Sequence, residues 1–84
     1  MSQPQIALGV ENQDMDEAWS RFVARLIRAR KSAKLSQRAL GEKADMSKSF
    51  ISNIENKNTN PSLMTILRLA EALEISTSSL FADD

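Results

Sequence analysis

Residues 35–60 read LSQRALGEKADMSKSFISNIENKNTN, and they decide the fold because they predict two short helices joined by a tight turn. Ser36 is a good N-cap, and the residues behind it, 37–43, form an amphipathic stretch of two turns. Ser47 follows a break in that pattern and caps a second helix, which we expect to end at about Asn56.

The second helix has two different faces. Ile51 and Ile54 are three residues apart and therefore share one face. The opposite face carries small polar side chains and one cation: Lys48, Ser49, Ser52 and Asn53. Hydroxyls, amides and a lysine with little bulk suit insertion into the DNA major groove, where such groups read base edges. The pattern therefore predicts a helix-turn-helix with a recognition helix at about 47–56.

The composition limits the function classes. A chain of 84 residues allows one domain with a modest core. It has no Cys and no His, so we expect no disulfide, no metal site and no cofactor. Only two glycines are present, and no phosphate-binding loop or nucleophile elbow occurs, which argues against an enzyme. No apolar run approaches the ~20 residues of a membrane span and no signal peptide is visible, so we expect a cytoplasmic protein.

The charge is zero overall but unevenly distributed. Residues 18–60 contain ten basic and three acidic side chains, a net charge of +7, and the flanks hold one basic and eight acidic side chains, a net charge of −7. Helical domains often carry such charges only as solvated surface. Because the basic segment coincides with the helix-turn-helix pattern, it favours one face that binds nucleic acid.

Outside residues 35–60 the pattern predicts three more helices. Residues 1–13 have no helical period and are expected to be a flexible tail, so that the domain comprises 14–84. Ile6, Leu8 and Val10 alternate, so the alternative is a short strand that orders against another copy. An acidic cap at Asp14, three residues ahead of Glu17, loads the first turn with negative charge and predicts a helix from there to about Ala33. We expect Trp19, on this helix, to lie in the core or to cover the tail, with a subunit contact as the alternative.

The C-terminal part begins with a turn-rich loop, 56–60, and continues with the most apolar helix of the chain, 62–74. Its apolar residues predict a central role in the core: Leu63, Ile66, Leu67, Leu69, Ala70 and Leu73. Ser76 is a candidate cap for a last short helix over 77–81. The predicted fold is an all-α domain of five helices.

The sequence also resembles the lambda-repressor/Cro-type helix-turn-helix proteins, in the branch called xenobiotic-response-element-like transcriptional regulators, over roughly residues 22–81. The matching landmarks are Arg30, Leu35-Ser36-Gln37, Leu40, Met46-Ser47, Ile51-Ser52, Ile54-Glu55, Pro61-Ser62 and Leu69-Ala70-Glu71-Ala72-Leu73. The chain departs from the pattern where glycine is common in the family, at Lys34, Asp45 and Lys57. It also has Gly41 in place of the usual alanine that faces the first helix.

The resemblance implies roles for several residues. The base-reading positions are Lys48, Ser49 and Asn53, with Ser52 on the same face. The DNA backbone is expected to meet Gln37, Arg38, Ser47, Asn56, Lys57 and Asn58. Arg30 and Glu55 correspond to a partly buried ion pair that ties the first helix to the recognition helix. Leu80 and Phe81 are the candidate apolar anchors of a homodimer, although Leu80 could instead pack under the fourth helix.

The resulting hypothesis is a homodimer that binds a double-stranded, palindromic DNA operator and regulates transcription, with no small-molecule effector evident. Restriction-modification controller, antitoxin, phage-type repressor and general regulator all fit this hypothesis. The alternative from another class is a protein-interaction module in which the same helix meets an acidic partner protein. Sequence preference among DNA duplexes would distinguish the two, because an acidic protein partner would compete with all duplexes similarly.

Overall fold

The computed structural model describes the backbone of residues 4–81 and the side chains of residues 15–81. All regular structure in this range is helical, with four α-helices and one 3-10 helix. The elements in order are α1 (Pro4–Ser32), α2 (Gln37–Ala44), α3 (Lys48–Glu55), α4 (Leu63–Leu73) and η1 (Thr77–Leu80). The all-helical fold is confirmed. The count of five α-helices is not confirmed, because the last short helix is a single turn of 3-10 helix.

The short C-terminal turn is held together by serine hydroxyls. Ser76 stands at its N-cap position, but its side chain bonds no backbone N–H. Its Oγ lies 3.1 Å from that of Ser78 and 3.2 Å from that of Ser79, and Ser79 Oγ donates to the Ser76 carbonyl at 2.6 Å. Side chains that bond locally in this way compete with an α-helix, which explains the tighter turn.

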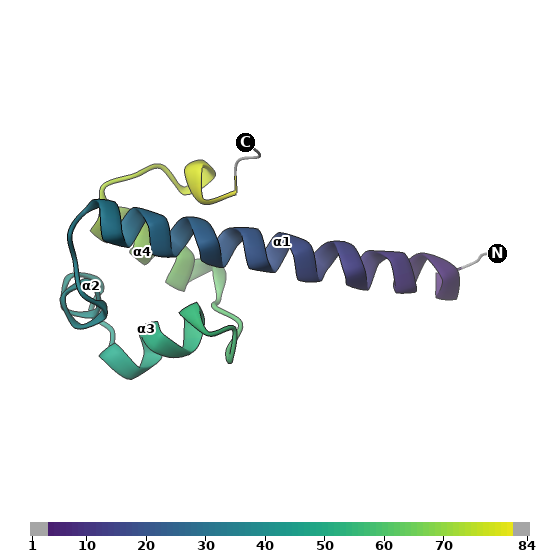
Figure 1. Cartoon of the computed structure of the whole chain (residues 1–84), viewed down its shortest axis with the longest axis horizontal. Helices are drawn as coiled ribbons and strands as arrows, with labels where there is room; N and C mark the ends of the chain where they lie inside the picture. The colour runs from purple at the N-terminus through teal and green to yellow at the C-terminus, as the bar shows by residue number, and fades with distance from the viewer. Residues whose placement is uncertain (1–3, 82–84) are drawn as a thin grey trace.

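Helix α1 begins ten residues earlier than the acidic cap suggested. It starts at Pro4, so residues 4–13 are helical where the sequence predicted a tail or a short strand. Proline suits the first turn of a helix, and five of the nine residues that follow are good helix formers: Gln5, Ala7, Leu8, Glu11 and Gln13. Figure 1 shows this N-terminal part of α1 projecting beyond the other helices.

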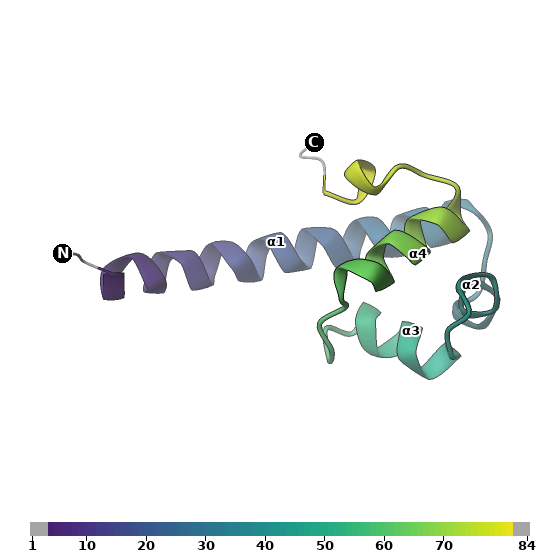
Figure 2. The same ribbon diagram turned by 180° about the vertical axis from the view of Figure 1, so that it is seen from behind.

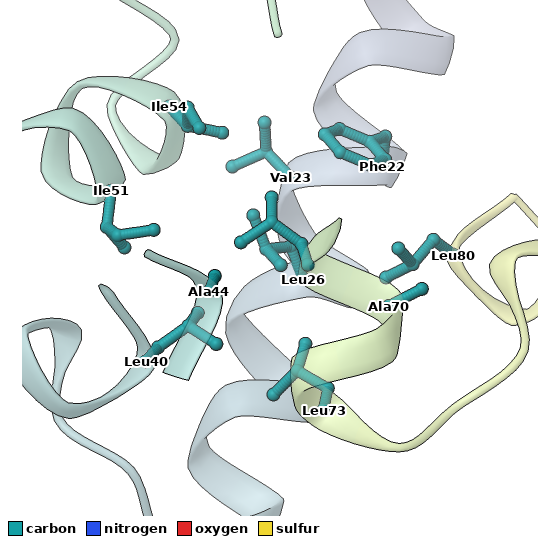
Figure 3. Close-up of a cluster of buried hydrophobic side chains, with 11 residues drawn as sticks. Phe22, Val23, Leu26, Leu40, Ala44, Ile51, Ile54, Ala70, Leu73 and Leu80 are labelled. Carbon is teal, nitrogen blue, oxygen red and sulfur yellow. The ribbon is translucent and has the colours of Figure 1, made fainter. Parts of the chain in front are cut away.

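The remaining helices surround the C-terminal half of α1. In both Figure 1 and Figure 2, α3 lies on one side of α1 and η1 on the other, with α4 crossing beside α1. Figure 3 shows the core between them. The largest fully buried side chains among residues 15–81 come from all five elements: Leu26, Leu40, Ile51, Ile54, Leu69 and Leu80. Burying each contributes ~1.5–3 kcal/mol relative to exposure, so this core fixes how α2 and α3 stand on α1.

Three serines begin three of the helices. Ser36, Ser47 and Ser62 accept hydrogen bonds from the backbone N–H three residues further on, at 3.0, 3.0 and 3.1 Å. These are the N-caps that the sequence predicted for α2 and α3, and Ser62 is the cap of α4.

Each α-helix is followed by a non-glycine residue in the left-handed conformation. These residues are Lys34, Asp45, Lys57 and Glu74, with φ between 59° and 61°. Three of them are the positions where the family commonly has glycine. The chain therefore keeps the left-handed geometry and accepts a side chain in it.

Gly41 makes the turn between α2 and α3 possible. The backbone N–H of Met46 donates to the Gly41 carbonyl at 2.7 Å. A Cβ on Gly41 would lie 2.4 Å from the Met46 carbonyl oxygen, much closer than any ordinary contact. By the family resemblance, this position faces the first helix. The structure shows that it makes room for the backbone of the turn itself.

Helix α4 is less central to the core than its sequence suggested. Leu69, Ala70 and Leu73 are buried. Leu63 and Leu67 were expected in the core but are 69% and 41% exposed, and Met64 beside them is 60% exposed. These three residues, together with Phe81, are called the apolar stripe below.

Candidate nucleic-acid interface

Helix α3 has one buried face and one exposed polar face. Ile51 and Ile54 have no exposed surface, and Glu55 is also buried. On the other face Lys48, Ser49 and Asn53 are exposed, and Ser52 is partly exposed. The candidate base-reading residues therefore lie on one accessible surface, and the side chains opposite them fix the helix in place.

A network of four side-chain hydrogen bonds joins α1, α2 and α3. Arg30 donates from Nε to Glu55 Oε2 at 2.7 Å and from Nη2 to Glu55 Oε1 at 3.0 Å. Arg30 Nη1 also donates to the Leu35 carbonyl at 2.9 Å, and Gln37 Nε2 donates to Glu55 Oε1 at 2.9 Å. The side chains of Arg30 and Glu55 are 11% and 4% exposed. A bidentate guanidinium-carboxylate pair restricts the relative orientation of the two helices that it joins. This network therefore fixes the angle of α3 relative to α1 and α2.

Gln37 makes a contact within the chain that the sequence did not predict. The resemblance implied that it meets the DNA backbone, and the structure shows its side-chain N–H bonded to Glu55. It is the first residue of α2, so it also stands at the positive end of that helix. Arg38, the next residue, is exposed.

The loop after α3 turns sharply and is closed by local hydrogen bonds. Asn58 N donates to the Asn53 carbonyl at 2.8 Å and Lys57 N donates to the Ile54 carbonyl at 3.1 Å, a pair of bonds typical of a Schellman motif. Asn56 Nδ2 donates to Ser52 Oγ at 3.3 Å. Asn56, Lys57 and Asn58 are all exposed.

Lys57 contacts α1. Its Nζ donates to Ser20 Oγ at 2.6 Å and lies 5.9 Å from the centre of the Trp19 ring, within cation-π range. The sequence assigned Lys57 to the DNA backbone and did not suggest either contact. The only signals were a lone tryptophan on α1 and a lysine after α3, and nothing in their spacing connects them.

The two candidate dimer anchors differ. Leu80 is 1% exposed and fills the chain's own core, so the alternative left open by the sequence holds and Leu80 is not an exposed anchor. Phe81 is 54% exposed, and its ring stacks on that of Phe22 with centroids 5.3 Å apart. The rest of the apolar stripe was missed because α4 is apolar around most of its circumference, and its sequence does not indicate which side faces inward.

This arrangement agrees with comparisons to known proteins. A family model described as helix-turn-helix matches residues 26–80, more than half of the chain. The chain belongs to the helix-turn-helix family. The resemblance to lambda-repressor/Cro-type proteins is thereby confirmed, and the family is one of transcriptional regulators.

Three similar proteins support the assignment. The immunity repressor protein of Bacillus phage phi105 is 40% identical over 60 residues, which cover 71% of this chain and 42% of the repressor. The restriction-modification controller protein C.AhdI from Aeromonas hydrophila has a similar structure, with a TM-score of 0.72 and 35% identity over 75% of this chain and 96% of that chain. A transcriptional regulator from Vibrio cholerae gives a TM-score of 0.74 and 32% identity over 81% of this chain and 38% of the regulator.

In the part of the chain that the structure describes, no helix is both long enough and apolar enough to cross a membrane.

Proposed function

We propose that this protein is a sequence-specific DNA-binding repressor that acts as a homodimer and inserts α3 into the major groove. The observation that carries the proposal is the contrast within α3. Its inner face is fixed by Ile51, Ile54 and the Glu55 network, and its outer face is polar and exposed. A helix held rigidly with its polar side uncovered suits the reading of base edges.

The exposed side chains of α3 contact the base edges. Lys48 favours the O6 and N7 of guanine, and Asn53 favours the N6 and N7 of adenine. Ser49 discriminates weakly. Ser52 accepts a hydrogen bond from Asn56, so it contributes less to recognition than the other three.

Contacts to phosphate come from both sides of α3. On one side are the start of α2, with Gln37 and Arg38, and Ser47, the N-cap of α3. On the other side is the exposed loop of Asn56, Lys57 and Asn58. Lys57 would have to exchange its bond to Ser20 for one to phosphate.

The homodimer forms through the apolar stripe. Phe81, Leu63, Met64 and Leu67 are large apolar side chains left exposed by a small domain, and such surface marks a protein contact. A two-fold dimer with its recognition helices about one DNA turn apart, ~34 Å, would read a palindromic operator. This adjusts the anchors predicted from sequence, keeping Phe81 and replacing Leu80 with the exposed face of α4.

The test of DNA binding is its salt dependence. A module that neutralises Z phosphates has a log-log slope of about −0.9Z, so a dimer with ~6–10 contacts should lose ~10³–10⁵ in affinity between 50 and 200 mM salt. Fluorescence anisotropy with a duplex selected from a random pool measures this slope. A random duplex of the same length is the control, and equal affinity for both would contradict sequence-specific binding.

The test of the homodimer is Phe81→Glu. We expect a folded monomer that binds its operator weakly, because a charge in an apolar contact is costly to bury. Ala24→Glu is the matched control, since it adds the same charge at an exposed position of α1. Analytical ultracentrifugation at tens of micromolar measures both variants. If Phe81→Glu stays dimeric, the interface lies elsewhere.

A further inference from the structure

Lys57 connects the end of the recognition helix to α1. It follows Asn56, the C-cap of α3, and has a φ of 61°, a conformation that disfavours any residue with a side chain. Its side chain reaches α1, where Nζ donates to Ser20 Oγ at 2.6 Å and lies 5.9 Å from the centre of the Trp19 ring. We call the Ser20 hydroxyl and the Trp19 ring the lysine site. Both residues precede the matched family region, 26–80, so the lysine site is an addition to the family module.

The loop after α3 keeps its shape without the lysine site. The backbone N–H of Lys57 donates to the Ile54 carbonyl at 3.1 Å, and that of Asn58 donates to the Asn53 carbonyl at 2.8 Å. These backbone bonds close the turn whatever side chain residue 57 carries. The Lys57 side chain can therefore leave the lysine site while the loop stays folded.

The lysine site holds its cation with uncharged groups. Ser20 supplies a hydroxyl and Trp19 supplies the face of its ring. Lys57 and Ser20 are both exposed, so these contacts are made in water, where each contributes little. A DNA phosphate is an anion, so its hydrogen bond to the ammonium is charge-assisted and stronger, and the contact also releases counterions. A phosphate within reach of Lys57 would therefore displace the lysine site.

The lysine site lies on the side of α3 that faces α1. Ile51 and Ile54 turn the inner face of α3 toward the core that it shares with α1. Figures 1 and 2 show α3 beside α1, and the polar face proposed for DNA is the opposite, exposed one. The bond to Ser20 draws the Lys57 ammonium toward α1 and away from that face. The lysine site and phosphate are therefore alternative partners of one ammonium.

We propose that Ser20 and Trp19 are positioning residues that compete with DNA phosphate for the Lys57 ammonium and lower the affinity for every duplex. Neither residue touches DNA, and both act through Lys57. The inference rests on the proposed function, in which Lys57 meets phosphate, and names the residues that set the strength of this contact. Contacts to phosphate carry no sequence information, so the release of Lys57 has the same cost on operator and on random DNA.

Fluorescence anisotropy with a duplex selected from a random pool and a random duplex of the same length tests the proposal on the full chain. Ser20→Ala should bind both duplexes about two- to fivefold more tightly per protomer, the effect of one exposed hydrogen bond, with their ratio unchanged. Ser20→Thr keeps the hydroxyl and should bind like the parent. Ser32→Ala is the matched control, because Ser32 is an exposed serine of α1 outside the lysine site. In a Lys57→Gln background, Ser20→Ala should have no effect.

The salt slope and the tryptophan emission distinguish competition from a structural effect. Ser20→Ala should keep the salt slope of the parent, because the number of phosphates contacted is unchanged, whereas Lys57→Gln should lower the slope by about 0.9 per protomer. Trp19 is the only tryptophan of the chain, so its emission reports the departure of the ammonium. The selected duplex should change this emission in the parent and at least twofold less in Lys57→Gln.

Three results would overturn the competition. They are weaker or unchanged binding by Ser20→Ala, an equal gain in the Lys57→Gln background, and an emission change of the same size with and without Lys57. In each case the proposed function stands as long as the parent prefers the selected duplex to the random one. Equal affinity of the parent for the two duplexes would instead overturn the sequence-specific function, and the effect of Ser20→Ala would still be measured on random DNA.

Discussion

Helix α3 is eight residues long, and its two faces have different roles. The inner face is tied to α1 and α2 by the Arg30, Glu55 and Gln37 network and by two fully buried isoleucines. The outer face is exposed along Lys48, Ser49 and Asn53. The difference indicates that stability and recognition rest on separate side chains, so substitutions should affect one without the other.

The largest effect should come from the inner face. Glu55→Ala leaves the partly buried Arg30 guanidinium without its carboxylate and removes the acceptor of Gln37, which should cost ~3–5 kcal/mol of unfolding free energy. Glu42→Ala is the control, because Glu42 is an exposed glutamate of α2 and should change stability by less than ~0.5 kcal/mol. Urea denaturation measures both. Similar small losses for the two variants would mean that α3 is held by the isoleucines alone.

A smaller loss of stability should follow from Gly41→Ala. The new Cβ would meet the Met46 carbonyl oxygen at 2.4 Å, so the turn must shift, and overpacking of this kind costs ~1–3 kcal/mol. Gly9→Ala is the same substitution within α1, where alanine is the better helix former, and it should not reduce stability. Thermal unfolding of the pair checks the sign of each change. An unchanged melting temperature for Gly41→Ala would show that the turn yields easily.

On the outer face, Asn53→Ala should change recognition alone. We expect a loss of ~1–3 kcal/mol in binding at one base position of each half-site, with little effect on random DNA or on unfolding. Lys57→Ala is the informative comparison, since loss of a phosphate contact weakens specific and random binding alike. Anisotropy on both kinds of duplex gives the two ratios. Equal losses on both duplexes for Asn53→Ala would remove Asn53 from the base-reading residues.

Local signals in the sequence predicted the parts of the fold that depend on neighbouring residues. The serine N-caps of α2 and α3 were predicted because a cap and its helix lie within a few residues of each other. The exposed polar positions of α3 followed from helical spacing in the same way.

Features that depend on tertiary contacts were not predictable from local signals, with the exception of the Arg30–Glu55 pair, which the family resemblance implied. Nothing local reveals that Lys57 bonds Ser20, 37 residues away, or that Gln37 bonds Glu55. The inward side of α4 was ambiguous because apolar residues cover most of that helix. The start of α1 was misjudged because an acidic cap signal inside a helix looks the same as one at its beginning.

The four left-handed residues that follow the helices also bear on thermal tolerance. A side chain in this conformation costs ~1–2 kcal/mol, of which glycine would recover part after its own entropy is counted. A change of ~1 kcal/mol in unfolding free energy shifts the melting temperature of a domain this small by ~4–8 °C. The melting temperature is therefore lower than it would be with glycine at these positions. Two of the four, Lys34 and Lys57, add positive charge to the basic segment. Asp45 and Glu74 do not, so they are the positions where heat resistance could rise without weakening attraction to DNA.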